Sequence, residues 1–161
     1  MSAQTRIGRM LAGGLTAAAI LTASAGAHHS FAMYDMQAVR VFTGVATRVD
    51  PAANHLQLYF APMNQDRKNV ERNAKGEPIV WTIEMAGSAE MARQGISVNS
   101  FPPGTIFSVG LHPLRNGQPA GAREGGVFKC PAKTPPPPGK HCDAVKGHTA
   151  IGGAPLATPT K

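Results

Sequence analysis

Hydrophobic and polar residues alternate along three stretches in the middle of the chain, which predicts half-buried β-strands. In residues 39–49 (VRVFTGVATRV) the valines and threonines share one face, and Arg40, Phe42, Ala46 and Arg48 share the other. Residues 55–60 (HLQLYF) and 79–85 (IVWTIEM) alternate in the same way. The predicted core, which takes in a fourth strand as well, consists of Val41, Val45, Leu56, Leu58, Trp81, Ile83, Phe107 and Val109.

The pattern changes after the third stretch. Residues 87–95 (GSAEMARQG) predict a short helix, with Ser88 as its N-cap, an acidic residue in the first turn and Gly95 at its end. A fourth strand is predicted within 101–114, and Asn-Gly at 116–117 is typical of a tight hairpin leading to a weaker fifth strand over 122–129. The glycines of that fifth strand indicate a bulge.

This order of elements predicts a mainly β fold. Five strands with one short helix between strands three and four are typical of a small OB-like barrel, although another small barrel or a sandwich fits the same pattern. About 95 residues from 35 to 129 are enough for one small core. The polar, unpatterned residues 61–78 predict a long exposed loop between strands two and three.

Residues 1–27 have the pattern of an export signal. Arg6 and Arg9 precede an apolar run from 10 to 21, and the small residues 23–27 offer Ala-x-Ala cleavage after Ala25 or Ala27. A retained membrane helix is the alternative, but the run is shorter than the roughly 20 apolar residues that spanning requires. We therefore expect a cleaved signal peptide and a periplasmic protein without a transmembrane segment.

Charge adds little to this picture. Without residues 1–27, 14 basic and nine acidic residues leave a net charge of +5. The basic residues are scattered and form no dense run, and an exported protein meets little nucleic acid, so we expect no nucleic-acid partner.

The only two cysteines, Cys130 and Cys142, lie in a Pro/Gly-rich tail that spans residues 130–161. In an oxidising compartment this isolated pair predicts one disulfide, with two free thiols as the alternative. The four consecutive prolines at 135–138 favour an extended segment, so the chain must reverse, and Gly139 is a suitable place. Beyond Cys142 no periodicity is visible, and we expect a mobile end.

Several segments resemble a family of exported bacterial proteins, the domain of unknown function 6152. They are HHSFAMYDM, FTGVATRVD, WTIEMAG and PPGTIFSVGLHPLRNG, and the resemblance covers residues 28–129 of this chain. Its most specific element is His-His-Ser-Phe directly after the predicted signal. The family usually shows Trp-x-Asn-Pro-His before the second strand, whereas VDPAANHL here keeps only the histidine, His55. The resemblance implies a small periplasmic β-barrel and no established activity.

The paired histidines suggest metal chemistry. Cleavage after Ala27 would make His28 the amino terminus, so that its α-amine and imidazole could bind one metal ion, with His29 or His55 as a third nitrogen ligand. Such a nitrogen set suits Cu(II). Cleavage after Ala25 would instead give Gly-Ala-His, which also chelates Cu(II). The alternative is that His28 and His29 only pack against a strand edge.

A second hypothesis is a binding or structural module that uses the barrel face for an envelope protein, a peptide or a glycan. Outward-facing aromatic and basic side chains would carry it: Phe42, Tyr59, Arg40 and Arg48. The sequence shows no nucleophile elbow, phosphate loop or zinc-protease motif, so we expect no enzymatic activity. The remaining histidines, His112, His141 and His148, are predicted to face solvent or lie in the tail. The methionines form no dense cluster and are predicted to lie in the core or in loops.

Overall fold

A computed structural model describes residues 31–51 and 55–160. The predicted signal peptide and the histidine pair at 28–29 lie outside this range. The described chain contains six strands: β1 (Arg40–Asp50), β2 (Gln57–Pro62), β3 (Trp81–Glu84), β4 (Ile106–Pro113), β5 (Ala120–Lys129) and β6 (Thr149–Leu156). It also contains one α-helix, α1 (Ser88–Arg93), and two 3-10 helices, η1 (Phe31–Met33) and η2 (Cys142–Ala144).

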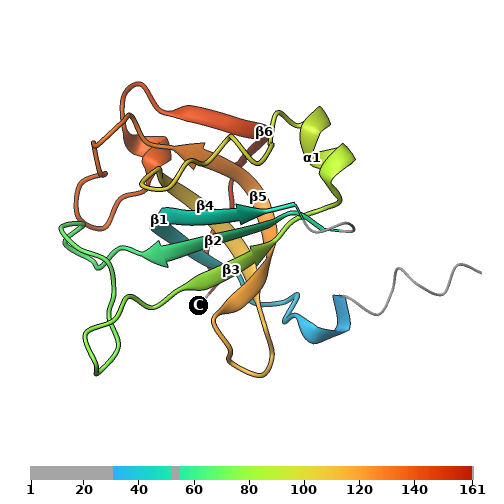
Figure 1. The fold of residues 1–161 in the computed structure, drawn as a ribbon, viewed down its shortest axis with the longest axis horizontal. Helices are drawn as coiled ribbons and strands as arrows, with labels where there is room; N and C mark the ends of the chain where they lie inside the picture. Colours follow the sequence, from blue (N-terminus) through green and yellow to red (C-terminus); the bar gives the residue numbers. More distant parts are fainter. Residues whose placement is uncertain (1–30, 52–54, 161) are drawn as a thin grey trace, which may run out of the picture.

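The first five strands form a closed mixed barrel (Figure 1). β1 pairs with both β2 and β4, and the barrel is completed by the parallel pairing of β3 with β5. The circular order β1-β2-β3-β5-β4, with α1 between β3 and β4, is that of the predicted OB-like barrel. The β4–β5 hairpin has Gly117 at its turn with φ of 75°, a conformation that glycine adopts without strain.

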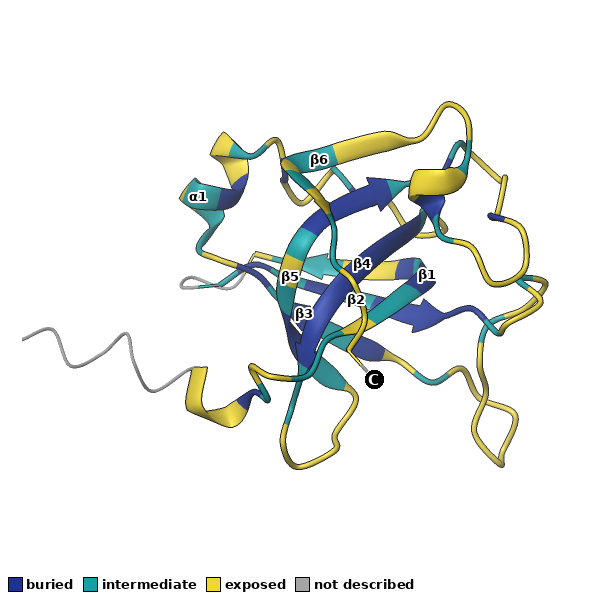
Figure 2. Cartoon of the chain, turned by 180° about the vertical axis from the view of Figure 1, so that it is seen from behind, coloured by how far each residue is buried: buried dark blue, intermediate teal, exposed yellow. Residues whose placement is uncertain are grey.

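The barrel interior is filled mainly by the predicted side chains. Leu56, Leu58, Ile83, Phe107 and Val109 are at most 2% exposed. Figure 2 shows the buried stretches of β4 and β5 that line this interior, while the loop between β2 and β3 is largely exposed, as predicted.

The predicted orientation of β1 is wrong. Phe42 and Ala46 pack against the barrel core, whereas Val41 and Val45 are only partly buried and lie on the other face. That outer face is itself covered, because Thr43 is 1% exposed and bonds to the C-terminal segment. Around Thr43 both faces of β1 are therefore covered, and alternation alone could not identify the inner one.

The C-terminal segment also differs from the prediction. The disulfide between Cys130 and Cys142 is confirmed, and the chain between the two cysteines includes Gly139 at φ of 71°. Instead of a mobile end, however, β6 pairs with the second half of β5, along the edge that β3 occupies in the first half. The glycine bulge predicted in β5 lies at Gly125, where the register with both neighbours shifts.

The helix boundaries follow the sequence with one exception. Gly95 ends α1 in a left-handed conformation, as predicted, but Gly87 is the N-cap and no side chain caps this end. Ser88 is therefore the first helical residue and not the cap. Within the described residues, no helix is long and apolar enough to span a bilayer.

Candidate functional site

The N-terminal arm, residues 31–39, lies against the β4–β5 hairpin. Met33 accepts a hydrogen bond from the Arg115 amide at 2.9 Å, and the Asp35 amide donates to Pro113 at 2.8 Å. These backbone bonds fix the arm, which follows the histidine pair in the chain, beside the end of β3.

Tyr34 and Glu84 form the centre of the site. Tyr34 is 4% exposed, and its hydroxyl donates to Glu84 Oε2 at 2.7 Å. Burial, reinforced by the hydrogen bond and by the negative charge of Glu84, raises the pKa of Tyr34 well above its usual range. The phenol therefore stays protonated at neutral pH and acts as a donor that holds one carboxylate oxygen.

His55 completes what we call the arm cluster, which consists of Tyr34, His55 and Glu84. Its Nδ1 lies 3.1 Å from the Met85 carbonyl and 3.4 Å from Glu84 Oε1. Both of these atoms are acceptors, so Nδ1 is the donor here, and in the neutral imidazole Nε2 would then have the lone pair. A histidine whose second nitrogen donates to a carbonyl or carboxylate is the usual arrangement of a metal ligand.

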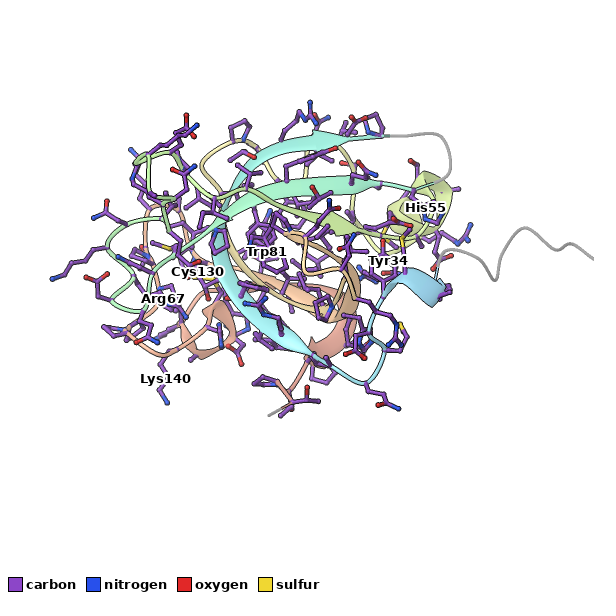
Figure 3. The ribbon with its side chains drawn as sticks, turned by 90° about the horizontal axis from the view of Figure 1, so that it is seen from below. Tyr34, His55, Arg67, Trp81, Cys130 and Lys140 are labelled. Carbon is purple, nitrogen blue, oxygen red and sulfur yellow. A yellow bond between two sulfur atoms is a disulfide. The ribbon has the colours of Figure 1, made fainter. Side chains whose placement is uncertain are left out.

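The segment that carries His55 is held in place by backbone pairing beyond the end of β3. The Leu56 amide donates to Ala86 at 3.2 Å, and the Met85 amide donates to Leu56 at 2.9 Å. This pairing orients the imidazole toward the arm. Figure 3 shows Tyr34 and His55 together at this end of the barrel, with Arg67, Lys140 and Cys130 at the opposite end.

Two cavities adjoin the arm cluster, and both are lined by Tyr34 and Glu84. The first, which we call the His55 cavity, has a volume of about 310 Å³ and is lined also by Phe31, His55 and Arg123. The second, the Tyr59 cavity, has a volume of about 610 Å³ and lies between the outer faces of β2 and β3 and the β4–β5 hairpin.

The charge in the His55 cavity is balanced. Arg123 is half-buried, its Nη2 donates to Gln94 Oε1 at 2.6 Å, and burial lowers its pKa without removing its charge at neutral pH. This cation faces the same cavity as the carboxylate of Glu84. Because the two charges offset each other, nitrogen donors would have to supply the affinity for a metal ion here.

Of the three histidines predicted to bind a metal ion, the structure describes one. His55 lies in the arm cluster, whereas His28 and His29 lie outside the described residues. Within 31–51 and 55–160 no group of three or more histidine, cysteine or acidic side chains is placed to hold a metal ion. His55 and Glu84 form only a pair.

The four residues predicted to bind a partner separate into two clusters. Tyr59 faces outward in the Tyr59 cavity, with the Arg48 guanidinium 4.1 Å from its ring centroid. The prediction that Phe42 faces outward is wrong, because it packs against the core at 4.7 Å from the Trp81 ring. Arg40 covers this end of the core, 4.9 Å from the Phe42 centroid. Their part in ligand binding stays a prediction.

Two of the remaining histidines are less exposed than predicted. His112 is 7% exposed, and its ring nitrogens contact the Ala38 carbonyl at 2.8 Å and Glu124 Oε2 at 3.2 Å. His141 is partly buried, with its Nδ1 2.9 Å from Thr43 Oγ1.

The bond between His141 and Thr43 belongs to a buried network that fastens the C-terminal segment to the barrel. Thr43 Oγ1 lies 2.7 Å from Ser108 Oγ, which accepts the Cys142 amide at 2.8 Å. Arg67 binds the same segment from the β2–β3 loop, through its Nη2 and the Lys140 carbonyl at 3.0 Å. Burial, and secondly the charge of Arg67, lowers the pKa of His141.

Sequence reasoning missed Tyr34 and Glu84. In the sequence, Tyr34 is one aromatic residue of the N-terminal arm, and Glu84 is one polar position of an alternating strand. No local sequence signal marks either residue, because the hydrogen bond between them joins the arm to β3 across a sequence separation of 50 residues.

The sequence matches a known protein family. A model of a family of unknown function, DUF6152, matches residues 17–123, about two thirds of the chain. The chain belongs to this family. The DUF6152 match covers the arm, the complete arm cluster and the barrel into β5, and it begins before the histidine pair. No curated protein and no solved structure matches the chain.

Proposed function

We propose that this DUF6152 protein is exported to the periplasm and binds Cu(II) through its processed amino terminus, without catalysing a reaction. One observation carries the proposal: Phe31 and His55 line the same cavity. His29 precedes Phe31 by two residues, and an extended chain spans at most about 3.6 Å per residue. The chain is therefore long enough for the histidine pair to approach the cavity that Phe31 and His55 line.

The ligand atoms follow from ordinary acid–base chemistry. Cleavage after Ala27 turns the His28 nitrogen from an amide into an amine with a pKa near 8, beside an imidazole with a pKa near 6.5. A cation displaces both protons readily at neutral pH. With Nε2 of His55 this gives three nitrogen donors, and tetragonal nitrogen coordination is preferred by Cu(II).

Glu84 would act around the metal and not on it. Its Oε2 is occupied by Tyr34, and its Oε1 lies near the protonated Nδ1 of His55. A carboxylate in this position fixes the orientation of the imidazole and increases its basicity.

The test compares the exported protein, its N-terminus verified by intact mass, with a variant that carries one extra Met before His28. Cu(II) titration at neutral pH should show at least a tenfold loss of affinity for the blocked terminus, about 1.4 kcal/mol. His55→Ala should also weaken binding, whereas the matched control His148→Ala should not. If the native chain binds no Cu(II), or if all variants bind it equally, the proposal fails.

Cleavage after Ala25 has a different signature. A Gly-Ala-His terminus supplies an amine, two amides and one imidazole, so it saturates Cu(II) without His55. In that case His55→Ala would leave the affinity unchanged while blocking the terminus would still reduce it, and intact mass would show a chain starting at Gly26.

The Tyr59 cavity favours a second candidate function, the binding of an envelope glycan or peptide. Tyr59 supplies an aromatic surface, and Gln57, Thr82 and Asn116 supply polar groups around it. Soluble muropeptides should perturb the NMR signals of β2 in the native protein and leave the Tyr59→Ala variant unperturbed. Equal perturbation of both would exclude this cavity.

A further inference from the structure

Side chains of β2 and β3 form one side of the Tyr59 cavity. Tyr59 lies directly opposite Thr82 in the register of the two strands, and Gln57 lies opposite Glu84. All four side chains line the cavity and are partly exposed, whereas Leu58, between Gln57 and Tyr59, is fully buried. Because successive side chains of a strand point to opposite faces, the register sets an aromatic ring among polar groups on the outer face of the barrel.

The β4–β5 hairpin and the arm enclose this surface. The Thr82 amide donates to the Pro119 carbonyl at 3.0 Å, which holds the hairpin against β3. The Arg115 amide donates to the Met33 carbonyl, which holds the arm against the hairpin (Figure 1). Since backbone bonds fix all three segments, the cavity of about 610 Å³ is formed before a ligand arrives. A preformed site loses little ordering entropy when it binds.

The charges that line the cavity offset each other. Among the described residues of its lining, the charged side chains are Glu84 and Arg115, which have opposite signs. Glu84 accepts the Tyr34 hydroxyl at 2.7 Å, and Arg115 Nη2 lies 4.0 Å from Asp35 Oδ1. Each charge therefore has a partner within the protein, and the cavity favours an uncharged ligand over an ionic one.

The ring of Tyr59 offers a surface for the C–H groups of a sugar. The Arg48 guanidinium covers one side of the ring at 4.1 Å from its centroid, but Arg48 does not line the cavity. The cavity therefore meets a part of the ring that Arg48 leaves uncovered. The hydroxyl of Tyr59 donates to Gln57 Oε1 at 2.7 Å, which fixes the ring. The negative face of an aromatic ring attracts weakly positive hydrogens such as those of sugar C–H groups.

Amide side chains supply hydrogen-bonding groups around this ring. Gln57 of β2 and Asn116 and Gln118 of the hairpin line the cavity. The oxygens of Gln57 and Asn116 accept bonds from Tyr59 and from the Gln118 main chain, so both NH₂ groups keep their donors for a ligand. An acetamido group presents a carbonyl acceptor to such donors. Its methyl group suits the apolar side chain of Leu114 in the same lining.

A peptide finds no strand edge here. Peptides that extend a sheet need a strand with unpaired main-chain groups. Within the cavity lining, β2 is paired with both β1 and β3, and β3 is paired with both β2 and β5. Recognition on this face therefore depends on side chains, which suits a ligand whose own polar groups are hydroxyl and acetamido groups.

We propose that the Tyr59 cavity binds an uncharged, N-acetylated oligosaccharide, with Tyr59 against a sugar ring and Gln57 and Asn116 at an acetamido group. This inference rests on the second candidate function, the binding of a ligand in the Tyr59 cavity, and adds the chemical class of that ligand. It depends neither on signal cleavage nor on copper, so it and the Cu(II) proposal can fail separately.

The test is a titration of the exported protein with triacetylchitotriose, followed by the NMR signals of β2 and β3. Tyr59→Leu keeps an apolar side chain and removes the ring, and we expect it to lower the affinity about tenfold. Gln57→Ala should also lower the affinity. The matched control is His148→Leu, which removes an exposed ring that does not line the cavity and should bind as the native chain does. Near-UV circular dichroism verifies that each variant is folded.

A second ligand and a change of salt separate the chemical classes. The stem tetrapeptide of peptidoglycan, without sugar, should cause no saturable shifts. Added NaCl should leave the affinity for the trisaccharide unchanged, because salt screens only charged groups. Saturable binding of the tetrapeptide but not of the trisaccharide would overturn the sugar assignment and keep the cavity as a binding site. Binding of neither ligand, or native trisaccharide affinity in Tyr59→Leu, would overturn both. A failure to bind Cu(II) would count against the Cu(II) proposal alone.

Discussion

Main-chain atoms orient the imidazole of His55. The Met85 carbonyl lies 3.1 Å from Nδ1, and the pairing of Leu56 with Met85 and Ala86 holds that carbonyl in place. The sequence identified His55 as a candidate, but the acceptor is a main-chain atom with no sequence signature. Its role could be recognised only once β2 and β3 were seen side by side.

The hydrogen bond from Tyr34 to Glu84 can be tested by removing one hydroxyl. Tyr34→Phe leaves a partly buried carboxylate without its donor, and bonds to charged groups contribute about 1.5–3 kcal/mol to stability. Tyr59→Phe is the matched control, since it removes a bond to the neutral Gln57 side chain. Chemical denaturation should show the larger loss of unfolding free energy for Tyr34→Phe. Equal losses would contradict the central place of Glu84.

The orientation of β1 is testable by comparing a core substitution with one on the outer face of β1. Leu58 is fully buried, so Leu58→Ala should lower the unfolding free energy by about 2–5 kcal/mol. Val41→Ala should cost clearly less, because Val41 lies partly exposed on the outer face. Similar losses from both variants would show that the valine face is an inner face after all.

His141 should make stability depend on pH. Its pKa in the folded protein is lowered, chiefly by burial, so the unfolded chain binds a proton more readily. The unfolding free energy should therefore fall as pH is lowered through about 6.5, the ordinary histidine value, toward the folded value. His141→Gln should flatten this part of the curve measured by urea denaturation, and the exposed His148→Gln should not. If the pH dependence of the unfolding free energy is the same in His141→Gln as in the native protein, other groups cause it.

At the scale of elements, the sequence predicted those with strong local patterns. The three alternating stretches, the β4–β5 hairpin at Asn-Gly and the helix ending at Gly95 all appear where expected. The hairpin is not the tight one predicted, because residues 114–119 connect its strands and Asn116 does not adopt a positive φ. β6 could not be predicted, because its residues TAIGGAPL carry little hydrophobic contrast and include Gly152 and Gly153 at positive φ. It forms because β5 presents an unpaired edge once β3 ends, which is a tertiary cause.

The disulfide fastens the segment that covers the outer face of β1. Closing a loop of this length stabilises a protein by about 3 kcal/mol through the entropy of the unfolded chain. Cys130→Ser/Cys142→Ser should show a loss of that order in thermal or chemical unfolding, with the barrel's far-UV spectrum retained. A double variant as stable as the native protein would show that the Thr43, Ser108 and His141 network alone holds the segment.

At the scale of the whole molecule, different segments of the chain cover the two ends of the barrel. One end is closed by the disulfide segment and the β2–β3 loop, and the other receives the arm that follows the histidine pair (Figure 3). The order of strands was predictable from alternation and turn chemistry. The meeting of arm, β3 and hairpin was not, because it depends on the parallel pairing of β3 with β5 and on where the hairpin projects.

The central claim is that the processed terminus and His55 bind the same Cu(II) ion, and pulsed electron paramagnetic resonance tests it most directly. In the Cu(II)-loaded exported protein, the remote nitrogens of coordinated imidazoles give resolved modulation. The account predicts imidazole signals from both the terminus and His55, with one imidazole lost in His55→Ala and none lost in His148→Ala. A spectrum unchanged by His55→Ala would contradict the claim.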